Sequence, residues 1–262
     1  MLYLLYGFCN KIFNFVSLSY NPLSAPRWFL RPKHSLFFLS LFCGTVTIEE
    51  ILRVQIKGGL MSYIYSVLAQ ISDKAAFSEA GKTWVPGSLE KLGVRSFSST
   101  EVVMGGELSG MCVVGFEYDS VDAAMAGQAG LYADSEMVAM MQATQVQVVR
   151  RNLFRVQSER GERRGQYGTI LYMAGRPLDD ATMESNMDHN WSHIHEGANG
   201  LTWLMAVASG PSPFNATAVT WTDSLDSLLA ASNKMFADPK TMQIMADSGA
   251  QVLGRIVGRN ML

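Results

Sequence analysis

The chain has 262 residues, of which 48% are hydrophobic and 17% are charged, and its formal net charge is −2. This composition is typical of a globular protein and excludes an intrinsically disordered chain. The charges are divided unevenly, because residues 1–60 carry six Lys or Arg against two acids, whereas residues 61–262 carry fifteen against twenty-one. The acidic main part lacks the basic face that phosphate binding requires, so we expect no nucleic-acid partner.

Residues 1–60 differ from the rest of the chain in their basic and apolar composition. Their longest uncharged runs do not reach the roughly 20 apolar residues that a membrane-spanning helix needs. The residues Lys57-Gly58-Gly59-Leu60-Met61 could be encoded by a purine-rich bacterial ribosome-binding site just before a start codon. We therefore expect residues 1–60 to be a leader that is disordered or absent from the native protein, which would begin at Met61. The alternative is a membrane-associated leader.

From Met61 onward, the sequence predicts one β-α-β-β-α-β unit. Ser72-Asp73 and Asp119-Ser120 supply the caps of its two helices, and Pro86 and Gly105-Gly106 interrupt the regular patterns. The strands are predicted at residues 63–71, 94–104, 108–118 and 145–156. Cys112, the one cysteine after Met61, lies in an apolar run, which predicts a buried structural thiol and excludes a disulfide framework there.

The unit is repeated. A shift of 104 residues aligns residues 119–155 with residues 223–259, and eleven of these 37 positions are identical. Unrelated sequences would share about two, so tandem duplication is the simplest interpretation. The second copy predicts strands at 167–174, 216–222 and 251–260, and a helix that begins at Asp179 or Asp180. Residues 158–165, between the copies, are predicted to be a solvated linker rather than a basic binding patch.

Two such units predict an α+β fold with two tandem ferredoxin-like repeats, at residues 61–157 and 166–262. Each antiparallel sheet carries its helices on one face, so its other face needs a cover. The sister repeat is the obvious partner. We therefore predict that the two antiparallel sheets pack into an α/β barrel.

In repeat length, element order and the Asp-Ser-x-Asp helix cap, residues 61–262 resemble the dimeric α/β-barrel superfamily in its tandem form. This superfamily includes antibiotic-biosynthesis-type monooxygenases that use no cofactor, haem proteins of the chlorite dismutase kind and muconolactone isomerases. The resemblance implies a monooxygenase-like enzyme that acts on a small hydrophobic or aromatic compound without a cofactor. Its alternatives are a haem-binding protein of the chlorite dismutase kind and a non-catalytic oligomeric binding or stress protein.

From the same features we expect a soluble, cytoplasmic, bacterial protein that forms a homo-oligomer through helix faces or sheet edges. The partner expected from the resemblance is a small molecule, and no membrane partner is expected for residues 61–262.

Three of the four histidines lie close together, whereas the corresponding first-copy segment, Gly81–Leu89, contains none. At about 100° per residue, His189, His193 and Glu196 share the helix face opposite to the sheet. Their spacing would allow a transition-metal site, because two imidazoles one turn apart can converge on one ion. A solvated or interface face is nevertheless favoured, since no further metal-binding pattern accompanies them.

His195 and Asn190 flank the buried face of the same helix and are the predicted catalytic residues. His195 would act as a general base or an axial haem ligand, with capping of the helix end as the alternative. Asn190 would orient a polar group of the substrate in a mostly apolar pocket. Four aromatic residues are predicted to contact the ligand or to fill the core instead, namely Trp191, Tyr172, Trp203 and Trp221. Fifteen methionines after residue 60 predict an adaptable core.

Overall fold

The computed structural model describes residues 61–262, and the expectations for residues 1–60 lie outside the described residues. The first repeat contains β1 (Ser62–Gln70), α3 (Lys74–Lys82), α4 (Val85–Lys91), β2 (Ser96–Met104), the 3₁₀ turn η1 (Gly106–Leu108), β3 (Cys112–Tyr118), α5 (Val121–Ala133), α6 (Ser135–Ala143) and β4 (Gln147–Gly161). The second contains β5 (Tyr167–Ala174), α7 (Asp180–Ile194), β6 (Gly200–Ala208), β7 (Ala216–Thr222), α8 (Leu225–Ala237), α9 (Pro239–Ser248) and β8 (Gln251–Asn260).

The duplication is visible in the element bounds. Strands β2 and β6, strands β3 and β7, and helices α5 and α8 begin and end 104 residues apart, which is the offset of the sequence repeat. The predicted caps are also present, because the Asp73, Ser120 and Asp179 side chains each accept a backbone N–H three residues further on. Local sequence therefore fixes where the helices of both repeats begin.

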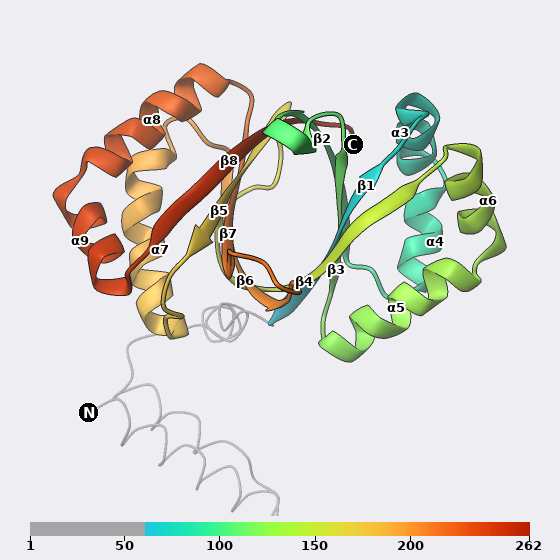
Figure 1. Ribbon diagram of the computed structural model, residues 1–262, viewed down its shortest axis with the longest axis horizontal. Coiled ribbons are helices and arrows are strands. Elements are labelled where there is room, and N and C mark those ends of the chain that lie inside the picture. The colour runs from blue at the N-terminus through green and yellow to red at the C-terminus, as the bar shows by residue number, and fades with distance from the viewer. Residues whose placement is uncertain (1–60) are drawn as a thin grey trace, which may run out of the picture. The chain divides into compact units, whose positions relative to one another are not determined.

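The eight strands form one closed antiparallel barrel in the order β1-β3-β2-β8-β5-β7-β6-β4. Each repeat contributes four neighbouring strands, and the two repeats join where β2 pairs with β8 and where β4 pairs with β6. The helices of the two repeats lie on opposite outer sides of this barrel (Figure 1). The predicted α+β fold of two ferredoxin-like repeats in an α/β barrel is therefore confirmed.

The helix-free faces of the two sheets enclose a shared interior, as predicted. Phe154, Leu204 and Phe214 form a buried cluster there, and Tyr172 packs against it. Each repeat has a separate core between its helices and the outer face of its sheet. Closure leaves neither repeat with an unpaired sheet edge, which removes a common cause of aggregation.

The segment 158–165, expected to be a solvated linker, is instead part of the barrel over its first half. Strand β4 continues to Gly161, and Ser158 pairs with Trp203 of β6. Arg163 contacts Glu159 at 2.6 Å and Glu117 of β3 at 2.7 Å, so the charges neutralise one another. Burial raises the pKa of Glu117, but Arg163 and two serine hydroxyls outweigh it and hold the pKa below its ordinary value. The charge run therefore closes the barrel where we expected a loop.

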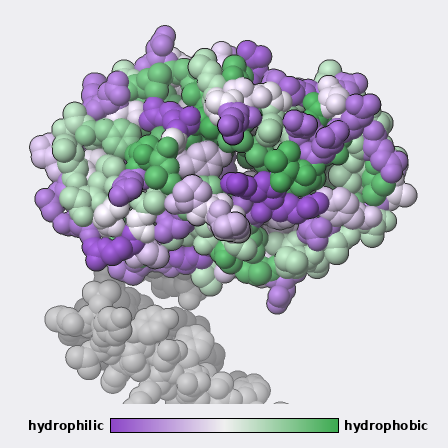
Figure 2. Space-filling view, viewed as in Figure 1, coloured by the Kyte–Doolittle hydropathy of each residue, from purple (hydrophilic) through white to green (hydrophobic). Residues whose placement is uncertain are grey.

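Cys112 is fully buried, as predicted, and burial raises the pKa of its thiol to about 11. Strand β3 begins only at Cys112 because η1 and the turn at Ser109 and Gly110 occupy the start of the predicted strand. Hydrophilic and hydrophobic residues are interspersed over the face shown in Figure 2. None of the helices in residues 61–262 has the length and apolar character needed to span a lipid bilayer.

Candidate functional site

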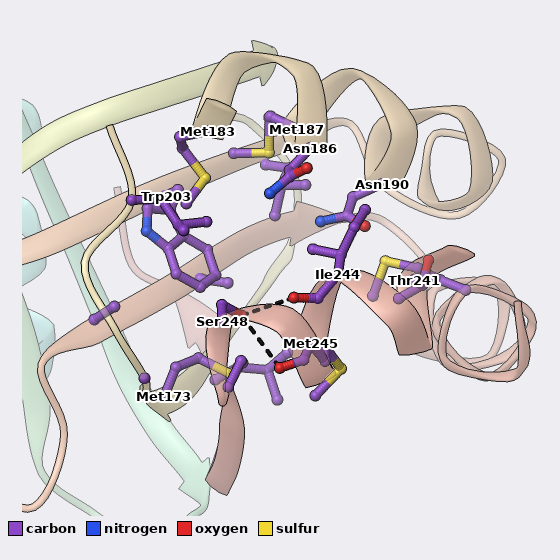
Figure 3. Close-up of a pocket in the computed structure, with 18 of the residues that line it drawn as sticks. Met173, Met183, Asn186, Met187, Asn190, Trp203, Thr241, Ile244, Met245 and Ser248 are labelled. Atoms are coloured by element: carbon purple, nitrogen blue, oxygen red, sulfur yellow. Dashed lines mark hydrogen bonds between the residues drawn. The ribbon is translucent and has the colours of Figure 1, made fainter. Parts of the chain in front are cut away.

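The second repeat encloses a cavity of about 100 Å³ between its helices and the outer face of its sheet, which we call the helix-side cavity. Helix α7 contributes Met183 and Met187 to its wall, and α9 contributes Ile244 and Met245 on the other side (Figure 3). The floor comes from β5, β6 and β7. Most of the lining is apolar, and six methionines line it: Met173, Met183, Met187, Met205, Met235 and Met245. Unbranched methionine side chains allow such a cavity to adapt to a ligand.

Small residues on β7 explain why the cavity exists. Ala218 and Thr220 occupy the places that Val114 and Phe116 take in the first repeat, at the 104-residue offset. In the first repeat, Phe116 stacks on Phe97 and Tyr65, with ring centroids 5.4 and 5.9 Å away, and the equivalent cavity measures about 60 Å³. Loss of side-chain volume on one strand has therefore opened the second repeat.

Two buried polar atoms in the lining lack a hydrogen-bond partner among the described residues. They are Oδ1 of Asn190 and Nε1 of Trp203. An unsatisfied buried polar group costs about 1–3 kcal/mol, so such atoms at the wall of a cavity point to a ligand or water that satisfies them. One atom accepts and the other donates. Figure 3 shows Trp203 and Asn190 on different sides of the lining, so each atom needs its own polar partner.

The helix-side cavity offers little acid–base chemistry. Its lining residues include no carboxylate, amine or imidazole, and the one charged group is the Arg176 guanidinium, which donates a hydrogen bond to the Asp247 carbonyl. The arrangement can bind and orient a small molecule and exclude water. Proton transfer by a protein side chain has no candidate there among residues 61–262.

A second and larger cavity lies inside the barrel and measures about 460 Å³. Tyr172, Trp221 and Asn152 line it, and Oδ1 of Asn152 is buried without a partner in the described part of the chain. Burial raises the pKa of Tyr172, and Arg150 opposes that rise. The sheet separates the two cavities, because successive residues of a strand face opposite sides.

The structure therefore divides the four aromatic residues predicted to contact a ligand. Trp203 lines the helix-side cavity, whereas Tyr172 and Trp221 line the barrel interior. Trp191 is half-buried and lies against Gly161 of β4, outside both linings. Strand facing decided these positions, and the sequence left that open.

Of the two predicted catalytic residues, Asn190 lines the helix-side cavity and His195 does not. His195 is exposed at the C-terminal end of α7, and its Nδ1 lies 3.0 Å from the carbonyl oxygen of Trp191. This contact is the helix-end capping that we considered as the alternative. The structure therefore places Asn190 beside this cavity and His195 outside it, because the imidazole turns back onto its own helix. The catalytic roles of both residues stay predictions.

His189 and His193 are also placed differently from the expectation. Their helix face does not point to solvent, because Asp238, between α8 and α9, packs against it, with Nε2 of His189 2.8 Å from the carboxylate. Glu196, the third predicted metal ligand, instead contacts Lys234 at 3.1 Å on the surface. The helical spacing identified the pair of imidazoles, but the partner comes from a helix that is distant in sequence.

The residues present do not fit haem in either cavity. No histidine lines the helix-side cavity or the barrel interior. A cavity of about 100 Å³ is smaller than the roughly 150 Å³ that accommodates benzene, and a porphyrin is several times larger than benzene. Axial ligation by His195 would require α7 to rearrange.

No family model matches the chain, and a search of curated proteins found no match. The fold resembles 59 chains of solved structures. They include a chlorite dismutase variant from Candidatus Nitrospira defluvii (9% identity, TM-score 0.47, 76% of this chain and 90% of that chain). Two others are a candidate monooxygenase from Fusobacterium nucleatum (11%, 0.47, 77% and 92%) and a haem-binding protein from Thermus thermophilus (12%, 0.48, 76% and 90%). At these identities and TM-scores, the similarity concerns the arrangement of the chain and does not extend to activity or cofactor.

Proposed function

We propose that the second repeat binds a small, mainly apolar molecule with one polar group in the helix-side cavity. The observation that supports this is the pair of unpartnered atoms, Asn190 Oδ1 and Trp203 Nε1, in an otherwise apolar lining. A hydroxyl group of the ligand could donate to the former or accept from the latter. An aromatic ring with a phenolic hydroxyl has this chemistry. A single ring needs roughly 150 Å³, so the methionines must move to enlarge the cavity of about 100 Å³ before it can bind.

As its reaction we propose oxygenation of the bound compound by O₂ without a cofactor. One oxygen atom of O₂ would enter the substrate and the other would leave as water. The two hydrogen atoms of that water must come from the substrate when no cofactor supplies them, so that a phenol becomes a quinone. An electron-rich phenol or hydroquinone is therefore the substrate class. Asn190 and Trp203 would orient it, and the N–H of Trp203 would stabilise negative charge on its oxygen. The substrate's own acidity replaces a protein base, because the lining holds none.

Calorimetric titration with phenol and benzene tests the binding step, because the two ligands differ by one hydroxyl. We expect phenol to bind roughly tenfold or more tightly than benzene, since a satisfied buried group is worth about 1–3 kcal/mol. Asn190→Leu and Trp203→Phe should each reduce this preference, and His195→Ala should not. Equal affinity for phenol and benzene in the unmodified protein would contradict the role of the two polar atoms.

Oxygen consumption tests the reaction. The protein is incubated with electron-rich phenols and hydroquinones, and an oxygen electrode and mass spectrometry follow O₂ uptake and the gain of one oxygen atom in the product. Uptake that Trp203→Phe reduces would support catalysis. Binding without uptake would identify a non-catalytic binding protein.

A further inference from the structure

Two imidazoles and one carboxylate meet on the outer side of α7. His189 and His193 lie one turn apart on this helix, and Asp238 lies at the junction of α8 and α9. Nε2 of His189 is 2.8 Å from one carboxylate oxygen of Asp238, and Nε2 of His193 is 3.8 Å from the other. One ligand atom from each of the three residues lies within 4.8 Å of the other two. All three side chains are partly exposed, between 14% and 28%.

His189 is hydrogen-bonded to Asp238, whereas His193 is left with room for a metal ion between its imidazole and the carboxylate. The distance of 3.8 Å from His193 to Asp238 is too long for a hydrogen bond, so that imidazole has no direct bond to the carboxylate. Around a tetrahedral zinc ion with Zn–N distances of roughly 2.0–2.1 Å, ligand atoms stand about 3.3 Å apart. The two observed distances lie on either side of this value. Small side-chain rotations would therefore bring the three groups to one ion.

Comparison of the two repeats separates these histidines from the needs of the fold. Asp238 caps α9 by accepting the Thr241 N–H, and Asp134 caps α6 in the same way in the first repeat. Helices α3 and α4 of the first repeat contain no histidine. The aspartate cap thus belongs to both copies and works without imidazoles. The histidine pair is an addition of the second repeat.

We propose that His189, His193 and Asp238 bind a divalent transition-metal ion, for which zinc is the best match to two imidazoles and one carboxylate. The ion would tie α7 to the junction of α8 and α9. Thr241, whose hydroxyl lies 3.3 Å from Nε2 of His189, also lines the helix-side cavity. The ion would therefore stabilise the helix layer that encloses this cavity. The proposal does not depend on the ligand-binding function, because metal and phenol binding are measured separately.

Metal titration of the full 262-residue chain tests the proposal. After removal of metals with a chelator, zinc binding is measured by calorimetry, and cobalt binding by the visible absorption of the coordinated ion. We expect one ion at this site and a rise in Tm of roughly 5–10 °C at about a hundredfold excess over Kd. His193→Ala should weaken zinc binding by more than about tenfold and change the cobalt spectrum.

Asp238→Asn is the matched variant, because asparagine still caps a helix but is a poorer metal ligand. It should lose the ion while the Tm of the metal-free protein changes little. His195→Ala and Asp134→Asn are the controls and should bind zinc as the unmodified chain does. Zinc affinity and a cobalt spectrum that survive both His193→Ala and Asp238→Asn would overturn the proposal and would place any bound metal elsewhere.

Discussion

Filling the helix-side cavity should stabilise the protein and abolish ligand binding at the same time. Ala218 of β7 is buried, lines this cavity and corresponds to Val114 of the first repeat. Ala218→Val adds two methyl-sized groups, which would occupy roughly 60 Å³ at the roughly 30 Å³ that a water molecule takes in the liquid. At about 0.8 kcal/mol per buried CH₂, the gain in the free energy of unfolding is about 1.5 kcal/mol. For a domain of this size, Tm should rise by roughly 3–6 °C.

The assay combines thermal unfolding with phenol titration on the same variant. We expect the higher Tm together with a loss of phenol affinity of more than about tenfold, since the added methyl groups take space from a cavity that is already smaller than a single ring needs. Val219→Phe is the matched control, because Val219 is the next residue of β7 but faces the barrel interior. If Val219→Phe abolishes binding and Ala218→Val does not, the ligand lies inside the barrel and our assignment is wrong. A lower Tm in Ala218→Val would show that the cavity is not free space.

Two further substitutions, each with a control variant, test the architecture. Glu117→Gln should lower the free energy of unfolding at neutral pH by about 2 kcal/mol, because it leaves Arg163 partly unpaired. Chemical denaturation measures this loss. The control is Glu162→Gln at an exposed ion pair, which should lower the free energy of unfolding by less than about 0.5 kcal/mol. Since folding lowers the pKa of Glu117, its contribution is present above the unfolded pKa of about 4.5 and is lost as the pH falls through the lower folded pKa; an unchanged acid-unfolding midpoint in Glu117→Gln would refute this. Gly161→Ala should lower the free energy of unfolding by about 3 kcal/mol, because Gly161 has a φ of 71° and an added Cβ would clash with the Asn199 carbonyl. Its control is Gly87→Ala in α4, where an added Cβ meets no neighbour. This change should raise the free energy of unfolding by up to about 1 kcal/mol.

The fold could be predicted from sequence because its signals are local and occur twice. Strands β5, β7 and β8 have the bounds that residue type alone predicted, and the helices begin at the predicted caps. The path of residues 158–161 could not be predicted in the same way. Their charges resemble a loop until Arg163 meets Glu117, which lies 46 residues away in sequence and next to it in the barrel. A pattern within a short stretch of sequence cannot predict an ion pair between residues that are far apart in the chain.

The candidate site was predictable only in part, for a related reason. Helical periodicity placed Asn190 beside the sheet correctly, because that position depends on α7 alone. The His195 side chain could point into a pocket or hydrogen-bond to a carbonyl of its own helix. It lies against the Trp191 carbonyl, which helical periodicity alone could not predict. The partner of His189 depended on where α9 begins relative to α7. The repeat alignment contains one signal that we missed. Ala218 and Thr220 of β7 are smaller than Val114 and Phe116, the residues with which they align.

The barrel gives a physical reason why the two repeats can differ in this way. Closure needs the paired edges of both copies, so every strand is under a common constraint of register. The side chains that face the helices are free of that constraint, because backbone pairing does not depend on their volume. The first repeat fills this layer with stacked rings of Tyr65, Phe97 and Phe116, whereas the second leaves it open and adds two imidazoles on its outer side. Stability can thus rest on the first copy while the second gains a binding site.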